Sequence, residues 1–138
     1  MITEAKTFTL PTGAKLDRRQ AFDVHIAQAQ EAIGRRDWTS AERFLDRAHV
    51  IGQPSAVDHV RAHVWMLVCG WKKRDGAEIV GQVWRLLVAA PASLLGKYPA
   101  GNTGRTNVSG FSPMPIAPDL RELLGQTSSD GERRRARS

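Results

Sequence analysis

Apolar residues that recur at spacings of three and four dominate residues 17–91, and this period restricts the region to amphipathic helices. The first stripe consists of Phe22, Ile26, Ala29 and Ile33. Three further stripes begin near residues 37, 55 and 75. The pattern predicts an all-α domain with four main helices. The residues expected to face inward on the fourth helix are Ile79, Val83, Leu86 and Leu87.

Helix start and stop signals divide this region. The first helix begins at Asp17, and Asp37, Ser55 and Asp75 are suited to cap the next three. The sequence leaves the start of the second helix undetermined by one or two residues, because Thr39-Ser-Ala-Glu42 also fits a capping box. The expected stops are Gly34 with Arg35 and Arg36, Gly52 with Pro54, the run Lys72-Lys73-Arg74, and Pro91.

The two halves of the helical region resemble each other at an offset of 38 residues. Phe22 aligns with Val60, and the Arg36-Asp37 pair aligns with Arg74-Asp75. This similarity predicts two helix–turn–helix hairpins, like the units of helical-repeat proteins. Arrays of this kind usually need about three units, one more than the chain holds.

The composition changes after residue 91 and divides the chain into four parts. Residues 1–16 are expected to be irregular, and residues 17–91 form the four-helix core. Residues 92–126 form an ordered Gly/Pro-rich arm, extended over the helices and containing a short helix. Residues 127–138 form a disordered basic tail. The apolar anchors expected along the arm are Leu94, Leu95, Tyr98, Val108, Phe111, Met114 and Ile116.

The net charge of +6 requires a polyanionic partner to be considered. The basic groups, however, lie at expected helix ends and in the tail, and no nucleic-acid motif or interleaved aromatic pattern is present. Specific nucleic-acid binding is therefore not expected. The apolar runs are too short to insert into a membrane. Because no signal peptide is visible and Cys69 is the one cysteine, a cytoplasmic location is expected.

Three of the four histidines fall within fifteen positions and are the main functional signal. His59 and His63 are four residues apart, so they share one helix face as two imidazole ligands of one ion would. His49 comes from the preceding helix, and His25 lies on the apolar side of the first. These four residues are the candidate ligands of a divalent metal ion. Imidazole-rich ligation suits zinc, copper, nickel or iron.

Polar residues near these histidines are candidates to orient the ligands through hydrogen bonds. They are Asp46, Asp58, Gln53 and Glu78. The competing interpretation is that the histidines only pack in the core, each donating one ring N–H to a nearby acceptor. Heme is the weaker cofactor alternative, because no CxxCH attachment sequence is present.

Three other features have both a functional and a structural interpretation. Gly101, Asn102, Thr103, Gly104 and Arg105 can hold an anion, but a tight turn in which Asn102 bonds its own backbone is favoured. Cys69 is expected to be a buried, inert thiol. Gln53 and Gln82 are expected to be buried polar bridges between the helices and the arm.

Several peptides carry a resemblance to a known family. They are AHVIGQ, HVRAHVWML, EIVGQVWRLLVAA, PAGNTGRTNV and PMPI, and together they span residues 48–116. The chain thereby resembles the small bacterial proteins grouped as domain of unknown function 3703. The resemblance implies a shared fold, and some members are encoded beside heavy-metal resistance genes. It supplies no activity, cofactor or catalytic residue.

The sequence therefore favours a small, histidine-rich, helical metal-binding protein that acts in metal handling or resistance. The first alternative is a helical-repeat-like module that binds a protein partner and uses its histidines structurally. The second is a small metalloenzyme with an open coordination position. The metal, any substrate and the oligomeric state stay open, and the sequence does not decide whether the protein is an enzyme.

Overall fold

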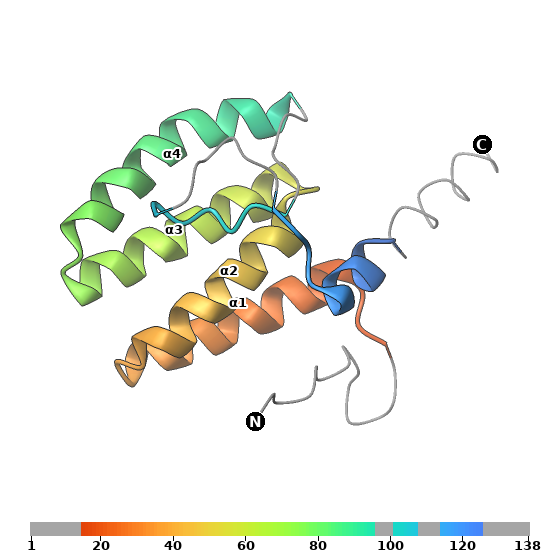
Figure 1. Ribbon diagram of the computed structural model, residues 1–138, viewed down its shortest axis with the longest axis horizontal. Coiled ribbons are helices and arrows are strands. Elements are labelled where there is room, and N and C mark those ends of the chain that lie inside the picture. Colours follow the sequence, from red (N-terminus) through yellow and green to blue (C-terminus); the bar gives the residue numbers. More distant parts are fainter. Residues whose placement is uncertain (1–14, 96–100, 108–113, 126–138) are drawn as a thin grey trace.

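The computed structural model describes residues 15–95, 101–107 and 114–125, apart from the side chains of residues 89, 90 and 92–94. The described chain contains four main helices (Figure 1). They are α1 (Arg18–Gly34), α2 (Trp38–Gly52), α3 (Ala56–Lys73) and α4 (Gly76–Leu94), and a shorter helix spans residues 118–125. The predicted all-α fold is confirmed. In the described residues, no helix is long and apolar enough to cross a membrane.

Side-chain caps begin the helices where the sequence predicts them. The carboxylate of Asp17 accepts from the N–H of Gln20 at 2.7 Å and completes a capping box. Asp37 caps α2 through the N–H of Ser40, so the earlier of the two candidate starts is correct. The same arrangement at α4 joins the carboxylate of Asp75 to the N–H of Glu78 at 3.1 Å. Each cap satisfies an N–H group that has no partner within its helix.

The two hairpin turns have the same backbone geometry, which confirms the predicted repeat. Arg36 and Arg74 both adopt a left-handed conformation, with φ of 58° and 62°. Asp37 N–H donates to the carbonyl of Ala32, and Asp75 N–H to that of Gly70, each at 2.9 Å. A bond of this span over a left-handed residue is the Schellman arrangement that ends many helices. The chain therefore reverses direction through the same Schellman arrangement in both hairpins.

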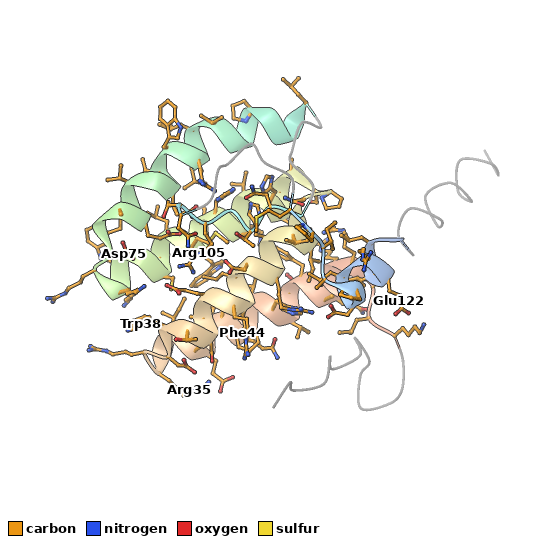
Figure 2. The ribbon with its side chains drawn as sticks, viewed as in Figure 1. Arg35, Trp38, Phe44, Asp75, Arg105 and Glu122 are labelled. Carbon is orange, nitrogen blue, oxygen red and sulfur yellow. The ribbon has the colours of Figure 1, made fainter. Side chains whose placement is uncertain are left out.

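The hairpins α1–α2 and α3–α4 lie side by side, in the order α1, α2, α3, α4 across the molecule (Figure 1). Both turns point to the same end, near Arg35 and Asp75 in Figure 2. The predicted stripe of α1 is buried, from Phe22 at 0% exposure to Ile33 at 8%. The largest fully buried apolar side chains are Phe22, Leu45, Ile51 and Met66.

The orientation of α4 differs from the prediction. Val83 and Leu87, expected inside, are 44% and 68% exposed. The inner face of α4 instead buries the polar side chains Glu78 and Gln82. The prediction failed because periodicity locates an apolar stripe without showing on which side of the helix the other elements pack.

The end of α4 also differs from the prediction. The helix continues through Pro91 to Leu94. Proline removes one N–H from the helical ladder but keeps its carbonyl, which here accepts from the N–H of Leu95 at 3.2 Å. Leu95, expected to anchor the arm, is 72% exposed.

The described parts of the arm pack against the helices. Residues 101–107 cross over α3 toward α4 (Figure 1), and Ile116 packs against the core. The short helix is confirmed and buries Leu120 and Leu123, while its Asp119 pairs with Arg47 on α2. Met114, another expected anchor, is half-buried. The remaining expected anchors, Tyr98, Val108 and Phe111, lie outside the described residues, as do the side chain of Leu94, residues 1–14 and the tail.

We expect Gly81→Ala to destabilise the protein by about 1–3 kcal/mol, because a methyl group there overpacks the contact between α4 and the arm. A Cβ on Gly81 would lie 1.9 Å from the Cγ2 of Thr106. Gly76→Ala on the same helix is the matched control, since a Cβ there meets nothing within 4 Å. Chemical denaturation measures both variants. Equal stability of the two would show that residues 101–107 do not pack closely on α4.

Candidate metal centre

Three imidazoles converge at the junction of the two hairpins. His49 lies near the end of α2, and His59 and His63 lie one turn apart on α3. The Nε2 atom of His49 is 2.8 Å from that of His59 and 3.1 Å from that of His63. The three side chains are 3%, 5% and 2% exposed, respectively. Together they offer three ligand nitrogens within 4.8 Å of one another.

The tight connection between α2 and α3 brings His49 close to His59. Only residues 53–55 separate the helices, so α3 begins beside the last turn of α2. Gly52 permits this approach, because a Cβ there would lie 3.0 Å from the ring of Phe22 and 3.1 Å from the carbonyl of Asp58. Helical spacing then stacks His63 one turn after His59.

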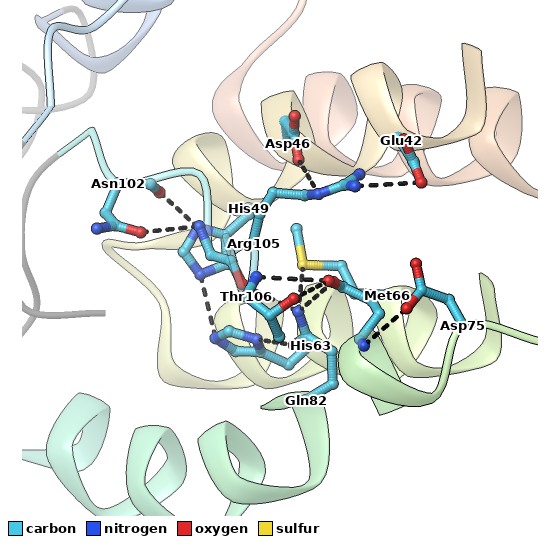
Figure 3. A network of polar contacts seen from close by, with 12 residues as sticks. Glu42, Asp46, His49, His63, Met66, Asp75, Gln82, Asn102, Arg105 and Thr106 are labelled. Carbon is cyan, nitrogen blue, oxygen red and sulfur yellow. Dashed lines mark hydrogen bonds and ion pairs between the residues drawn. The ribbon is translucent and has the colours of Figure 1, made fainter. Parts of the chain in front are cut away.

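A backbone carbonyl of the arm fixes the proton of His49. The Nδ1 atom lies 2.7 Å from the carbonyl oxygen of Asn102, which can only accept, so Nδ1 carries the hydrogen (Figure 3). Gln53 donates to the same oxygen at 3.2 Å, and its own Oε1 accepts from the N–H of Gly101 at 2.9 Å. The predicted polar bridge by Gln53 is confirmed. Gln53 does not contact His49 in this bridge; both side chains donate to the carbonyl oxygen of Asn102.

Gln82 fixes the proton of His63 in the same way. Its Nε2 donates to the carboxylate of Glu78 at 2.8 Å and to the carbonyl of Gly104 at 2.9 Å, and both are acceptors. Its Oε1 therefore faces the Nδ1 of His63, at 2.7 Å, and Nδ1 is the donor (Figure 3). Glu78 is held in turn by Thr106, whose hydroxyl and N–H both donate to it. The predicted bridge by Gln82 is also confirmed.

These bonds leave two lone pairs facing each other. A neutral imidazole carries one N–H, so with Nδ1 protonated the Nε2 atoms of His49 and His63 are both acceptors. They lie 3.1 Å apart. His59 can donate its Nε2 hydrogen to His49, but that hydrogen does not lie between His49 and His63. Without a cation the arrangement is repulsive, and a metal ion bound by the three nitrogens removes the repulsion.

Burial keeps the imidazoles neutral. Desolvation, and then the neighbouring His63 and His59, hold the pKa of His49 well below the usual 6.5. Desolvation, and then His63, lower the pKa of His59 to about 4. Desolvation also lowers the pKa of His63 against the opposing bond to Gln82. Neutral imidazole is the form that binds metals, so the site requires no deprotonation at neutral pH.

The segment 101–104 forms the predicted turn and packs on the cluster. Gly101 and Gly104 have φ of 76° and 77°, and the side chain of Asn102 accepts from the N–H of Gly104 at 2.9 Å. A Cβ on Gly104 would lie 2.6 Å from the Nε2 of His49. The N–H groups of Gly101 and Gly104 thus serve Gln53 and Asn102, and Arg105 pairs with Glu42 at 3.1 Å. These contacts occupy three of the groups considered for an anion, namely the N–H groups of Gly101 and Gly104 and the guanidinium of Arg105.

His25 does not join the other three histidines. Its Nδ1 donates to the carbonyl of Ala21 at 2.8 Å, and its Nε2 accepts from Arg47 at 3.1 Å. It is the buried, hydrogen-bonded core histidine of the competing interpretation. Asp58 is also engaged elsewhere, because its carboxylate pairs with Arg18 at 2.8 Å and with Arg61 at 3.4 Å.

Asp46 lies in a separate polar region. Its nearest ionic partner is Arg105, at 4.0 Å, and it lines an open cavity of about 370 Å³ with Glu42 and Arg105. Desolvation raises the pKa of Asp46 to about 7 against the attraction of Arg105. Cys69 is buried, and desolvation raises its pKa to about 11, consistent with the predicted inert thiol.

The dimensions of the cluster suit a transition metal. Four tetrahedral ligands at a Zn–N distance of about 2.0–2.1 Å are separated by about 3.3 Å. The two observed Nε2 separations, 2.8 and 3.1 Å, lie within about half an ångström of this value. The donors are nitrogen alone, which suits zinc, copper, nickel or iron better than oxygen-seeking magnesium or calcium.

One family sequence model matches the chain, over residues 16–124. Its description reads "Protein of unknown function (DUF3703)". No curated protein and no solved structure matches the chain. The match begins at buried Leu16 and ends at Leu124, which packs against the core, so it covers the helices, the histidine cluster and the described arm.

We expect the metal-free protein to lose stability as the pH falls from about 7 to about 5. In the unfolded chain histidine protonates near pH 6.5, whereas the pKa of His59 is about 4 in the folded state. In this window the unfolded state binds more protons, and each such histidine lowers the free energy of unfolding by about 1.4 kcal/mol per pH unit. Asp46 acts oppositely, because its raised pKa makes the folded state bind that proton first.

Denaturant titrations in the presence of a chelator measure this dependence. Asp46→Asn removes the opposing contribution and is expected to steepen the loss, while His59→Ala is expected to flatten it. If the Asp46→Asn protein were instead more stable at the lower pH, the histidines would not be buried in neutral form.

Proposed function

The chain belongs to the DUF3703 family of proteins of unknown function, and we propose that it binds one transition-metal ion through the Nε2 atoms of His49, His59 and His63. Within the described residues these three form the group that can hold an ion. With three protein ligands, further coordination positions remain for a water molecule or for a group of the molecule that delivers or receives the metal.

A single observation carries the proposal. The Nε2 atoms of His49 and His63 face each other at 3.1 Å, while their Nδ1 hydrogens are committed to Asn102 and Gln82. Buried polar groups are nearly always arranged so that donors meet acceptors. Two facing acceptors are therefore best explained by a cation that belongs between them.

The surroundings favour metal handling. Hydrogen bonds to Asn102 and Gln82 orient the imidazoles of His49 and His63, as is usual at metal sites. The cluster is buried and the segment 101–107 packs on His49, so movement of this segment would give an ion access. A site of this kind suits retention and transfer of zinc, copper, nickel or iron, and we place the protein in the cytoplasm.

We expect tag-free, chelator-treated protein to take up about one equivalent of metal per chain in titrations with zinc, copper and nickel. His59→Ala and His63→Ala are each expected to weaken binding by more than the 10–100-fold typical for loss of an outer hydrogen bond. His25→Ala is the matched control, since it removes a buried histidine that contacts Ala21 and Arg47. That variant should bind metal as the unmodified chain does, with a lower stability because a buried ring is lost.

Metal analysis of protein purified without a histidine tag provides the second measurement. The proposal would be contradicted if the affinity were no better than millimolar for all three metals and the His59→Ala and His25→Ala variants bound metal equally. The histidines would then serve packing alone.

We expect Gln82→Leu to reduce metal affinity about 10–100-fold while His49, His59 and His63 are all retained. The change removes the acceptor that holds the hydrogen of His63 on Nδ1, so the imidazole can shift that hydrogen to the ligating Nε2. Gln28→Leu on the exposed side of α1 is the control for the substitution itself. Unchanged affinity in Gln82→Leu would show that this hydrogen bond does not set the form of His63.

A further inference from the structure

The outer side of the α3–α4 hairpin carries an apolar face unlike any other described surface of the molecule. It consists of Val64 and Trp71 on α3 and of Val80, Val83, Trp84 and Leu87 on α4. These side chains are between 42% and 71% exposed. Figure 2 shows side chains projecting from the outer side of α4. On α1 and α2, the one comparably exposed large apolar residue is Val24, at 38%.

We propose that this apolar face docks against the same face of a second copy of the chain. The inference is independent of the proposed metal site, because none of the face residues belongs to the histidine cluster or bonds to it. It concerns the exposed surface of α3 and α4, whereas the cluster lies on their inner side.

The topology leaves this face open. Among the four main helices α4 packs on α3 alone, and it forms one edge of the helix array (Figure 1). At the other edge α1 exposes polar side chains such as Arg19, Gln28 and Glu31. Helical-repeat arrays require a polar outer surface on their terminal units to remain soluble. The α1 edge meets this requirement and the described part of the α3–α4 edge does not, which favours a further helical layer there.

The area fits a pair of copies. Trp71 and Trp84, 70% and 64% exposed, offer roughly 250 Å² in total. The aliphatic residues of the face bring the apolar area to on the order of 500 Å² at about 60–120 Å² per full side chain. A standard interface buries about 800 Å² per partner, of which about 60% is apolar, and so requires about 500 Å².

The charges also favour self-association over a charged partner. The face residues themselves are uncharged, so two copies bring no like charges together at its centre. The exposed cations Lys72 and Arg74 stand at the end of α3, beside the hairpin turn. An antiparallel two-fold pairing places this basic end opposite the far end of the partner hairpin and keeps the two basic groups apart.

Sedimentation velocity of the full chain in excess chelator tests the proposal, since the chelator prevents metal ions from bridging copies. We expect a species of twice the 15.2 kDa chain mass to form between about 1 and 100 µM, a range that brackets micromolar dissociation constants. Trp84→Lys and Val80→Lys should each weaken association at least 10-fold, because a two-fold interface would bury the new charge twice. Val24→Lys on α1 is the matched control and should still dimerise.

Three results would overturn the inference. The first is a wild-type chain that stays monomeric throughout this range, and the second is a Trp84→Lys dimer as stable as the wild type. The third is monomeric wild-type protein that sediments with vesicles of anionic phospholipid, which would assign the face to a lipid surface. Circular dichroism establishes that each variant is folded. All these readouts are independent of metal uptake, so failure here and failure of the metal proposal are distinguishable.

Discussion

Two imidazole hydrogen bonds determine how the interior is arranged. His49 donates to the carbonyl of Asn102, and His63 donates to the amide oxygen of Gln82. A buried donor without an acceptor costs about 1–3 kcal/mol, so the acceptors must stay in place. The segment 101–107 supplies one acceptor directly and holds the other through the carbonyl of Gly104. Glycines at both ends of its turn, and Gly81 beneath it, allow this close contact. Four elements are thus joined through polar contacts at the point where an all-apolar core would be expected.

The sequence predicted those parts of the structure that depend on neighbouring residues. Helix starts at Asp17, Asp37 and Asp75 and the repeated Arg-Asp turn follow from local backbone chemistry, and all are observed. Helical spacing together with a short connection also brought His49, His59 and His63 together. What local rules cannot supply is the rotation of a helix about its own axis, which depends on tertiary contacts. For this reason the prediction of which face of α4 points inward was wrong. The prediction that His25 joins the other three histidines was wrong for the same reason.

The fourth helix, α4, turns polar side chains inward and apolar side chains outward, and this arrangement connects the two proposals. Gln82 points inward to the histidine cluster, and Trp84, two residues later, points outward to the apolar face. A helix rotates by about 200° over two residues, so one element serves both surfaces. The polar side chains of Glu78 and Gln82 occupy the side normally reserved for packing, and the apolar stripe is displaced to solvent. Burial of the polar network is therefore the physical reason that a hydrophobic surface remains available.

The separation in sequence between the hairpins and the segment 101–107 sets an order of folding. Contacts within each hairpin are local and close short loops, so they form early, whereas Asn102 must find a residue 53 positions away. The acceptor of His49 consequently arrives last, after the helices have formed, whereas Gln82, the acceptor of His63, lies on α4 and arrives with the second hairpin. Until then the imidazole of His49 lacks the carbonyl that holds its ring hydrogen on Nδ1. We therefore expect a helical stage in which His49 is accessible before the segment 101–107 packs on it.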